Sequence, residues 1–193
     1  MTEIAKLTLE KKSPDSAAPR ARTALEKVQR GLGFIPHMYA NMANSPGALE
    51  TYSLGYSFIR ADSGFTPAEQ EVVFLTISHE NGCEYCMAAH SMVGEKMSGV
   101  PAAVLNALRA GLPLPEAKLQ ALSAFTRIMV RSRGKPVRQD LEAFLAAGFS
   151  EQQVLEIILA IAVKTISNYS NHVFHTKVDP VFSMYRWEKP KAA

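Results

Sequence analysis

Two cysteines, Cys83 and Cys86, stand three positions apart and are the only cysteines of the 193-residue chain. The breaker pair Asn81-Gly82 predicts that a new helix begins at about Cys83, and residues i and i+3 of a helix share one face. The free amides and positive dipole end of a helix start stabilise a thiolate, the reactive form of cysteine. His90, four residues after Cys86, projects from the same stripe and can act as a base or as a cationic partner. This pattern favours redox chemistry.

Two other interpretations of the pair stay open. A disulfide between such close residues closes a very small loop, so a purely structural bridge is not expected. The thiols could instead be inert core residues. They could also bind zinc with His90 and a fourth group, Glu71 or His79, because two cysteines and one histidine suit an open zinc site. A four-cysteine zinc site is excluded by the count.

Composition narrows the class of protein. Hydrophobic residues make up 47% and charged residues 20%, which is typical of a soluble globular chain. The net charge of +3 is dispersed without a basic block, so no nucleic-acid partner is expected. No apolar run reaches the roughly 18–20 residues of a membrane span, and the N-terminal segment has no signal-peptide core. We therefore expect a cytoplasmic protein, where a lasting structural disulfide is rare.

The spacing of apolar residues predicts an all-α fold of eight or so helices. Residues 1–21, with Pro14 and Pro19, resemble an extended arm, residues 22–187 form the domain, and residues 188–193 form a tail. Thr66, Pro67 and Glu69 have the arrangement of a capping box at the start of a largely apolar helix. Further helices are expected at about 23–32, 45–60, 83–97, 101–110, 115–133, 138–147 and 150–167.

An internal repeat is suggested when the chain is shifted by about 84 positions. Gly64-Phe65-Thr66 then lies over Gly148-Phe149-Ser150, and the apolar helices that follow run in step. Cys83 to Cys86 falls on Ser167-Asn168-Tyr169-Ser170. Two helix-pair units would make a pseudo-symmetric bundle, with sulfur in the first copy alone.

The segment around the cysteines strongly resembles the signature of the alkylhydroperoxidase D-like core, in the carboxymuconolactone decarboxylase superfamily. The matching positions are Glu71, Leu75, Ser78, Asn81, Cys83, Tyr85, Cys86 and His90. A looser similarity from about Thr23 to Lys177 resembles the peroxidase-related branch of that superfamily. The resemblance implies an all-α helical bundle, a homo-oligomer (dimer, trimer or hexamer) and thiol-dependent reduction of hydroperoxides. It implies no cofactor beyond the cysteine pair, which a dithiol or lipoyl-type reductant protein would reset.

By position, the resemblance makes Cys86 the peroxide-attacking thiol and Cys83 the resolving thiol, with Glu71 and His90 as a proton relay. Tyr85 is a departure, since well-known members have a histidine there, and tyrosine is a poor base near neutral pH. Ser78, Asn81 and His79 are expected to support the site, and His37, His172 and His175 are weaker candidates near a cavity or subunit interface. The alternative activity is lactone or decarboxylation chemistry, as in the name-giving members, which lack the cysteine pair.

Overall fold

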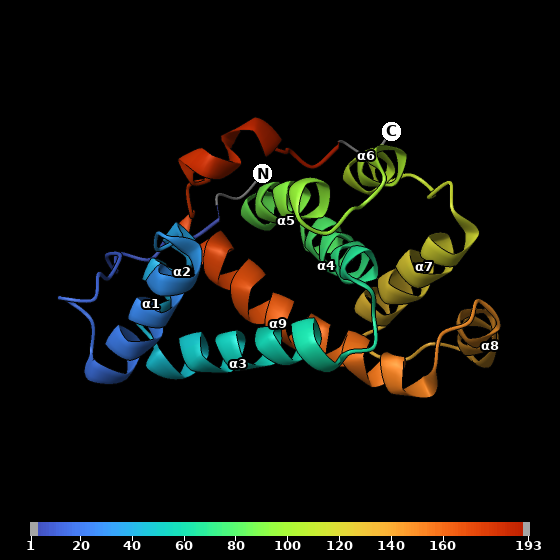
Figure 1. Cartoon of the computed structure of the whole chain (residues 1–193), viewed down its shortest axis with the longest axis horizontal. Helices are drawn as coiled ribbons and strands as arrows, with labels where there is room; N and C mark the ends of the chain where they lie inside the picture. Colours follow the sequence, from blue (N-terminus) through green and yellow to red (C-terminus); the bar gives the residue numbers. More distant parts are fainter. Residues whose placement is uncertain (1–3, 191–193) are drawn as a thin grey trace.

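The computed structural model describes residues 4–190, and residues 1–3 and 191–193 of the predicted arm and tail lie outside this range. The predicted all-α fold is confirmed: the described residues form nine α-helices and one short 3-10 helix (Figure 1). In chain order these are α1 (Pro19–Leu32), α2 (His37–Met42), α3 (Pro46–Asp62), α4 (Pro67–Asn81), α5 (Glu84–Lys96), α6 (Ala102–Ala110), α7 (Ala117–Arg131), α8 (Arg138–Ala146), α9 (Glu151–Phe174) and η1 (Pro180–Tyr185).

The N-terminal arm is shorter than predicted. Helix α1 begins at Pro19, because proline suits the first turn of a helix, and Ala21 is fully buried. The preceding residues are extended but attached to the bundle. The Leu7 amide donates to the Val173 carbonyl (2.8 Å), and the Lys12 amide donates to the Ala40 carbonyl (2.9 Å).

Helix α4 is the central helix of the bundle. It packs against α3, α5, α6, α7 and α9, and its residues from Glu69 to Ser78 are all buried. The predicted capping box is present, since the Glu69 amide donates to Thr66 Oγ1 and the Thr66 amide donates to the Glu69 carboxylate. The rigid start and buried face of α4 therefore fix the position of the loop that follows it.

The break between α4 and α5 occurs where the sequence predicts it. Gly82 has φ +68°, a left-handed conformation in which a side chain is strained, and its amide closes the end of α4. Cys83 is then the N-cap residue of α5, and Cys86 lies in its first turn. Helix geometry thus places both cysteines at the start of α5, as expected.

The second copy of the repeat has the helix-start capping box of the first copy but not the break between its two helices. Ser150 and Gln153 form a capping box like that of Thr66 and Glu69. However, α9 continues as one helix of 24 residues through the position equivalent to the α4–α5 break. Ile166 stands where the first copy has Gly82, and a β-branched residue does not adopt the left-handed turn. The predicted second helix pair is therefore a single continuous helix.

Two short elements of the fold were not predicted. Helix α2 follows Pro36 in a segment for which no helix was expected, and η1 lies in the C-terminal segment. Figure 1 shows the C-terminal segment (red) crossing over α5 toward α6, and η1 packs against α5. Within residues 4–190, no single helix is long and apolar enough to cross a membrane, although α8 and α9, bent by 110°, meet that length and composition test as a pair.

Candidate active site

The two cysteines are reduced, buried and faced by the inner side of α9. Cys83 is 1% exposed and Cys86 is 2% exposed. The side-chain amide of Asn171 donates to both sulfurs, at 3.7 Å from Cys83 Sγ and 3.4 Å from Cys86 Sγ. Ser167 Oγ lies 4.0 Å from Cys86 Sγ. The sulfur-free copy of the repeat therefore supplies polar groups to the sulfurs of the first copy.

Glu71 and His90, which are 19 residues apart, form a direct pair. His90 Nδ1 lies 2.8 Å from Glu71 Oε2, and the other carboxylate oxygen accepts from Arg60 of α3. Arg60 also donates to Gln70 Oε1 (2.9 Å) and to the Tyr56 hydroxyl (2.6 Å). Spacing alone could not place Glu71 beside a residue of α5. The packing of α4 against α5 brings the two together.

The electrostatics of this pair select one histidine tautomer. Burial raises the pKa of Glu71, but His90 and Arg60 together hold it below its ordinary value, so the group is a carboxylate. Burial and the nearby Lys164 charge lower the pKa of His90, so the ring is neutral near pH 7. A carboxylate only accepts hydrogen bonds, so Nδ1 carries the proton. The lone pair of His90 therefore lies on Nε2, which can act as a base.

The two thiols differ in acidity. Burial and the hydrogen bond to Cys86 raise the pKa of the Cys83 thiol well above its ordinary value. Burial also raises the pKa of Cys86, but the Cys83 hydrogen bond and the Lys164 charge outweigh it and hold that pKa well below the ordinary value. Cys86 is therefore the sulfur that ionises first.

Tyr85, between the cysteines in sequence, has its hydrogen-bond partner outside the Glu71–His90 pair. Its hydroxyl donates to Asp179 Oδ2 at 2.5 Å. The Asp179 carboxylate also accepts from the His37 amide (3.1 Å), and His37 Nδ1 lies 3.0 Å from the Lys177 carbonyl. Burial and Asp179 raise the pKa of Tyr85, so its phenol stays protonated. Tyr85 thus joins the cysteine loop to the segment before η1.

Two of the remaining predicted supporting residues, Ser78 and Asn81, have structural hydrogen-bond partners. The Ser78 hydroxyl donates to the Phe74 carbonyl within α4 (2.7 Å), and the Asn81 amide donates to Asn168 Oδ1 of α9 (2.9 Å). His79 does not join the sulfur site. Its ring lies 5.4 Å from the Trp187 ring, and its two nitrogens have no hydrogen-bond partner among the described residues.

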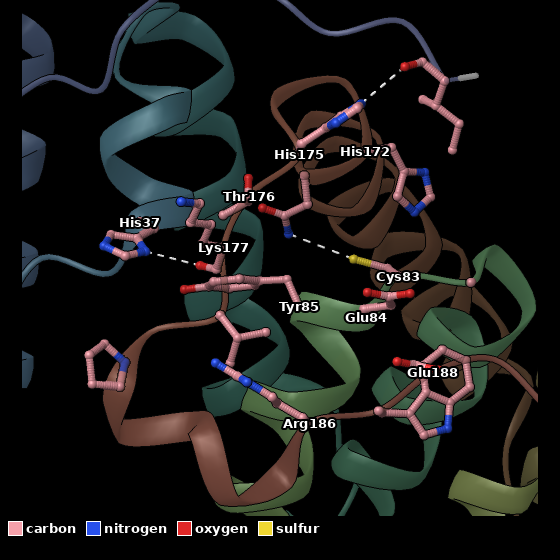
Figure 2. A pocket seen from close by; sticks show the side chains of 16 residues that line it. His37, Cys83, Glu84, Tyr85, His172, His175, Thr176, Lys177, Arg186 and Glu188 are labelled. Atoms are coloured by element: carbon pink, nitrogen blue, oxygen red, sulfur yellow. Dashed lines mark hydrogen bonds between the residues drawn. The ribbon is translucent and has the colours of Figure 1, made fainter.

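A cavity of about 780 Å³ opens beside the cysteine loop (Figure 2). Cys83 belongs to its wall, whereas Cys86 is not among its lining residues. Tyr85 of α5 also lines it, and other walls come from the end of α9 and the C-terminal segment, with His172, Arg186 and Trp187 among them. His37 and His175 also line it, and His175 Nε2 lies 3.1 Å from the Ile4 carbonyl. Cys83 is therefore the sulfur nearer to an incoming molecule.

The described residues offer no zinc-type ligand set at this site. In the range 4–190, no three His, Cys, Asp or Glu side chains are arranged to hold a metal ion. The fourth ligand considered from the sequence is also engaged elsewhere, since Glu71 is paired with Arg60 and His90. His79 lies against Trp187 instead of the sulfurs.

Two residues of the site were missed from the sequence. Asn171, which contacts both sulfurs, lies in the NYSNH segment that the repeat aligns with α5, so its general location was visible. Lys164 is fully buried in the apolar run of α9, and its Nζ has no hydrogen-bond partner within residues 4–190. A single charge inside an apolar helix was the available indication, because lysine is rarely buried without a partner.

The fold has close counterparts among solved structures, and the three described next have low sequence identity to this chain. A peroxidase-related protein from Ralstonia eutropha JMP134, described as an alkylhydroperoxidase AhpD core, superposes with a TM-score of 0.80 at 19% identity, over 94% of this chain and 96% of that chain. A peroxidase-related protein from Silicibacter sp. TM1040 superposes with a TM-score of 0.73 at 21% identity, over 94% of this chain and 95% of that chain. The debrominase Bmp8, in complex with 2,3,4-tribromopyrrole, superposes with a TM-score of 0.69 at 17% identity, over 96% of each chain. The chain therefore has the alkylhydroperoxidase D-like all-α fold.

Residues 46–127, from α3 into α7, match the model of the carboxymuconolactone decarboxylase family. This segment holds both cysteines, Glu71 and His90. The resemblance to the superfamily that the sequence indicated is thereby confirmed. No curated protein matches the chain.

Proposed function

We propose that the chain is a thiol-dependent oxidoreductase that reduces hydroperoxides through Cys83 and Cys86. The observation that carries the proposal is the pair of free sulfurs that share the Asn171 amide at the start of α5. The Glu71–His90 pair, which lies between α4 and α5, adds a carboxylate-oriented base. Together these groups provide an acidic thiol, a second thiol within reach and a proton acceptor.

In the proposed first step, the Cys86 thiolate attacks one oxygen of the hydroperoxide. A sulfur–oxygen bond forms, the O–O bond breaks, and the departing alkoxide takes a proton to leave as an alcohol. Cys86 becomes a sulfenic acid. Since Cys86 is already a thiolate and His90 is neutral, the proton for the leaving oxygen comes from solvent, and His90, held by Glu71, can relay it through Nε2.

In the second step, the Cys83 sulfur attacks the sulfenic sulfur of Cys86. A disulfide forms and the sulfenic oxygen leaves as water. An external dithiol then resets the pair by exchange, taking over the disulfide. Because Cys83 belongs to the cavity wall, the reductant is expected to attack Cys83. Cys86 is the better leaving group, since a thiol of lower pKa leaves faster.

The cavity favours an organic hydroperoxide over hydrogen peroxide. A volume of about 780 Å³ with the aromatic side chains of Tyr85 and Trp187 in its wall exceeds what hydrogen peroxide needs. The organic group would occupy this cavity while the peroxide group passes Asn171 to reach Cys86. The same cavity supports a second candidate, reductive removal of bromine from a small aromatic ring, by similarity to the debrominase complex. There the thiolate would take the bromine, the ring carbon would gain a proton, and Cys83 would displace bromide to form the disulfide.

We also propose that the chain acts as a cytoplasmic homo-oligomer. Large apolar side chains are exposed on the outer sides of α3 and α9, with Leu54, Phe58, Leu155, Ile158 and Tyr169 each about half exposed. Helices α3 and α9 pack against each other, so these residues belong to neighbouring helices. Light scattering after gel filtration gives the number of chains in the assembly.

Consumption of cumene hydroperoxide, with dithiothreitol as the reductant, tests the function. Cys86→Ser and Cys83→Ser are both expected to abolish turnover. Ser123→Ala is the matched control, because it changes a buried hydroxyl that pairs with Thr76 away from the sulfurs. Full turnover in both cysteine variants would reject the thiol mechanism. Activity on a muconolactone-type acid that survives alkylation of both thiols would instead support decarboxylase-type chemistry. Release of bromide from a bromopyrrole would support the second candidate, reductive removal of bromine from an aromatic ring.

A further inference from the structure

Lys164 is a charged residue that the proposed cycle does not yet use. It lies in the middle of α9, inside the apolar run ILAIAVKTIS, and its side chain is 0% exposed. Its Nζ has no hydrogen-bond partner among residues 4–190 and lies 5.6 Å from the centre of the Phe74 ring. Burial of an unpaired ammonium is costly, and a leucine or methionine would fill the same space. A lysine buried at this position is therefore expected to have an anionic neighbour.

The carboxylate of the site is already neutralised by another cation. Glu71 is paired with Arg60 on one oxygen and with His90 on the other. Since His90 is neutral near pH 7, the pair Glu71 and Arg60 has no net charge. Lys164 is left as the cation without an anionic partner in the described site.

The inner face of α9 brings Lys164 to Cys86. Lys164, Ser167 and Asn171 follow one another at intervals of three and four residues, so they share one stripe of the helix. Ser167 lies 4.0 Å from Cys86 Sγ, and Asn171 lies 3.4 Å from it. The Phe74 ring is close to both Lys164 and His90, at 5.6 Å from Lys164 Nζ and 4.9 Å from the centre of the His90 ring. These contacts place Lys164 in the buried region around Cys86, where its charge acts on the sulfur.

We infer that Lys164 is the counterion that holds the Cys86 sulfur as a thiolate. It acts through Cys86 and not on the substrate, so it is a positioning residue. The inference rests on the proposed function, in which this thiolate attacks the hydroperoxide and later leaves from the disulfide. Asn171 then supplies a hydrogen bond to the same anion, and Lys164 supplies the charge.

The other titratable groups around Cys86 do not provide that charge. Burial raises the pKa of the nearby tyrosines of α2 and α3, so they are neutral near pH 7. The titratable groups that interact electrostatically with Cys86 are Tyr39 of α2, Tyr52 and Tyr56 of α3, Cys83, Tyr85 and His90 at or in α5, and Lys164 of α9. Arg60 is paired with Glu71, so Lys164 is the remaining cation that can neutralise the Cys86 thiolate.

The test is the pH dependence of thiolate absorbance at 240 nm in the reduced full chain carrying Cys83→Ser, so that Cys86 alone reports. With Lys164 present, the midpoint is expected well below the reference value of about 8.5 for a free cysteine. Lys164→Met is expected to raise it by about 1–3 pH units, the usual effect of losing one adjacent opposite charge. The readout needs neither peroxide nor reductant.

Lys118→Met is the matched control. Lys118 also lies over an aromatic ring, 4.8 Å from the centre of Phe149, and pairs with Glu69, but its side chain is 53% exposed to solvent. This variant is expected to leave the midpoint unchanged. Lys164→Arg keeps a cation and is expected to retain a low midpoint. If Lys164→Met does not fold, as judged by circular dichroism at 222 nm, a normal thiol midpoint in folded Lys164→Arg would overturn the inference, and a low one would support it.

The titration tests the role of Lys164 as a counterion independently of the proposed peroxidase activity. A midpoint that rises in Lys164→Met supports the counterion even if the wild-type chain consumes no hydroperoxide. A midpoint that does not move in folded Lys164→Met overturns the counterion even if the chain is an active peroxidase.

Discussion

Replacement of Glu71 by glutamine tests whether its carboxylate organises the site. Glu71 is 0% exposed and neutralises Arg60 while it orients His90. Breaking one partner of a buried ion pair costs about 3–5 kcal/mol. Arg60 keeps Gln70 and Tyr56 as acceptors in the variant, so we expect the lower end, about 3 kcal/mol. For a chain of this length, that corresponds to a fall in Tm of roughly 6–12 °C, at about 2–4 °C per kcal/mol.

Thermal unfolding followed by circular dichroism at 222 nm measures this difference. Glu50→Gln is the matched control, because Glu50 forms the same kind of pair with Arg20 on the surface, where the two side chains are 38% and 71% exposed. Exposed pairs contribute little to stability, so the control is expected to unfold with the wild type. If Glu71→Gln also unfolded with the wild type, the carboxylate would not be the organising group of the site.

The pH dependence of the same measurement gives a second check. The pKa of Glu71 in the folded chain lies below its ordinary value, since burial raises it but His90 and Arg60 lower it further. A depressed carboxyl pKa adds stability that is fully present above the unfolded value of about 4.3 and is lost as pH falls through the folded value. The gap in Tm between the wild type and Glu71→Gln should therefore be full at pH 7 and should shrink below about pH 4. A gap that widened on acidification would contradict this account.

Two further predictions concern packing and the cysteine loop. Gly55→Ala should destabilise the chain by about 1–3 kcal/mol in urea unfolding, because its Cβ would lie 2.7 Å from Val163 Cγ2, where α3 packs against α9. Gly47→Ala, at an open position in the first turn of α3, should be neutral or slightly stabilising, and equal effects of the two would refute the close packing. Tyr85→Phe should lower the free energy of unfolding by about 1.5–3 kcal/mol, since it removes a hydrogen bond to the buried Asp179 carboxylate. An unchanged urea midpoint would show that this link does not hold the C-terminal segment.

The helices that carry the site could be predicted from local sequence. Thr66 and Ser150 marked the starts of α4 and α9 because their caps involve residues three positions away. Gly82 marked the break before the cysteines, because its backbone conformation is a local property. These features depend on neighbours in the chain, and neighbours are what a single sequence displays. The equivalent break in the second copy was not found, because Ile166 cannot form it.

The groups that complete the site come from far along the chain, and their partners could not be predicted. Tyr85 and Asp179 are 94 residues apart, and Asn171 is 85 residues from Cys86. Only the packing of α9 and of the C-terminal segment against α5 brings them together. The role of Lys164 could not be predicted for a related reason. A lysine inside an apolar helix has no interpretation until the sulfur that faces it is known.

Trapping of the sulfenic acid tests the central claim, that Cys86 attacks the peroxide, most directly. The reduced Cys83→Ser chain is treated with one equivalent of cumene hydroperoxide and dimedone, and the modified peptide is identified by mass spectrometry, with Cys86→Ser as the matched control. We predict a dimedone adduct on Cys86 in the first variant and no adduct on Cys83 in the second. An adduct on Cys83 without one on Cys86, or no adduct in either variant, would contradict the account.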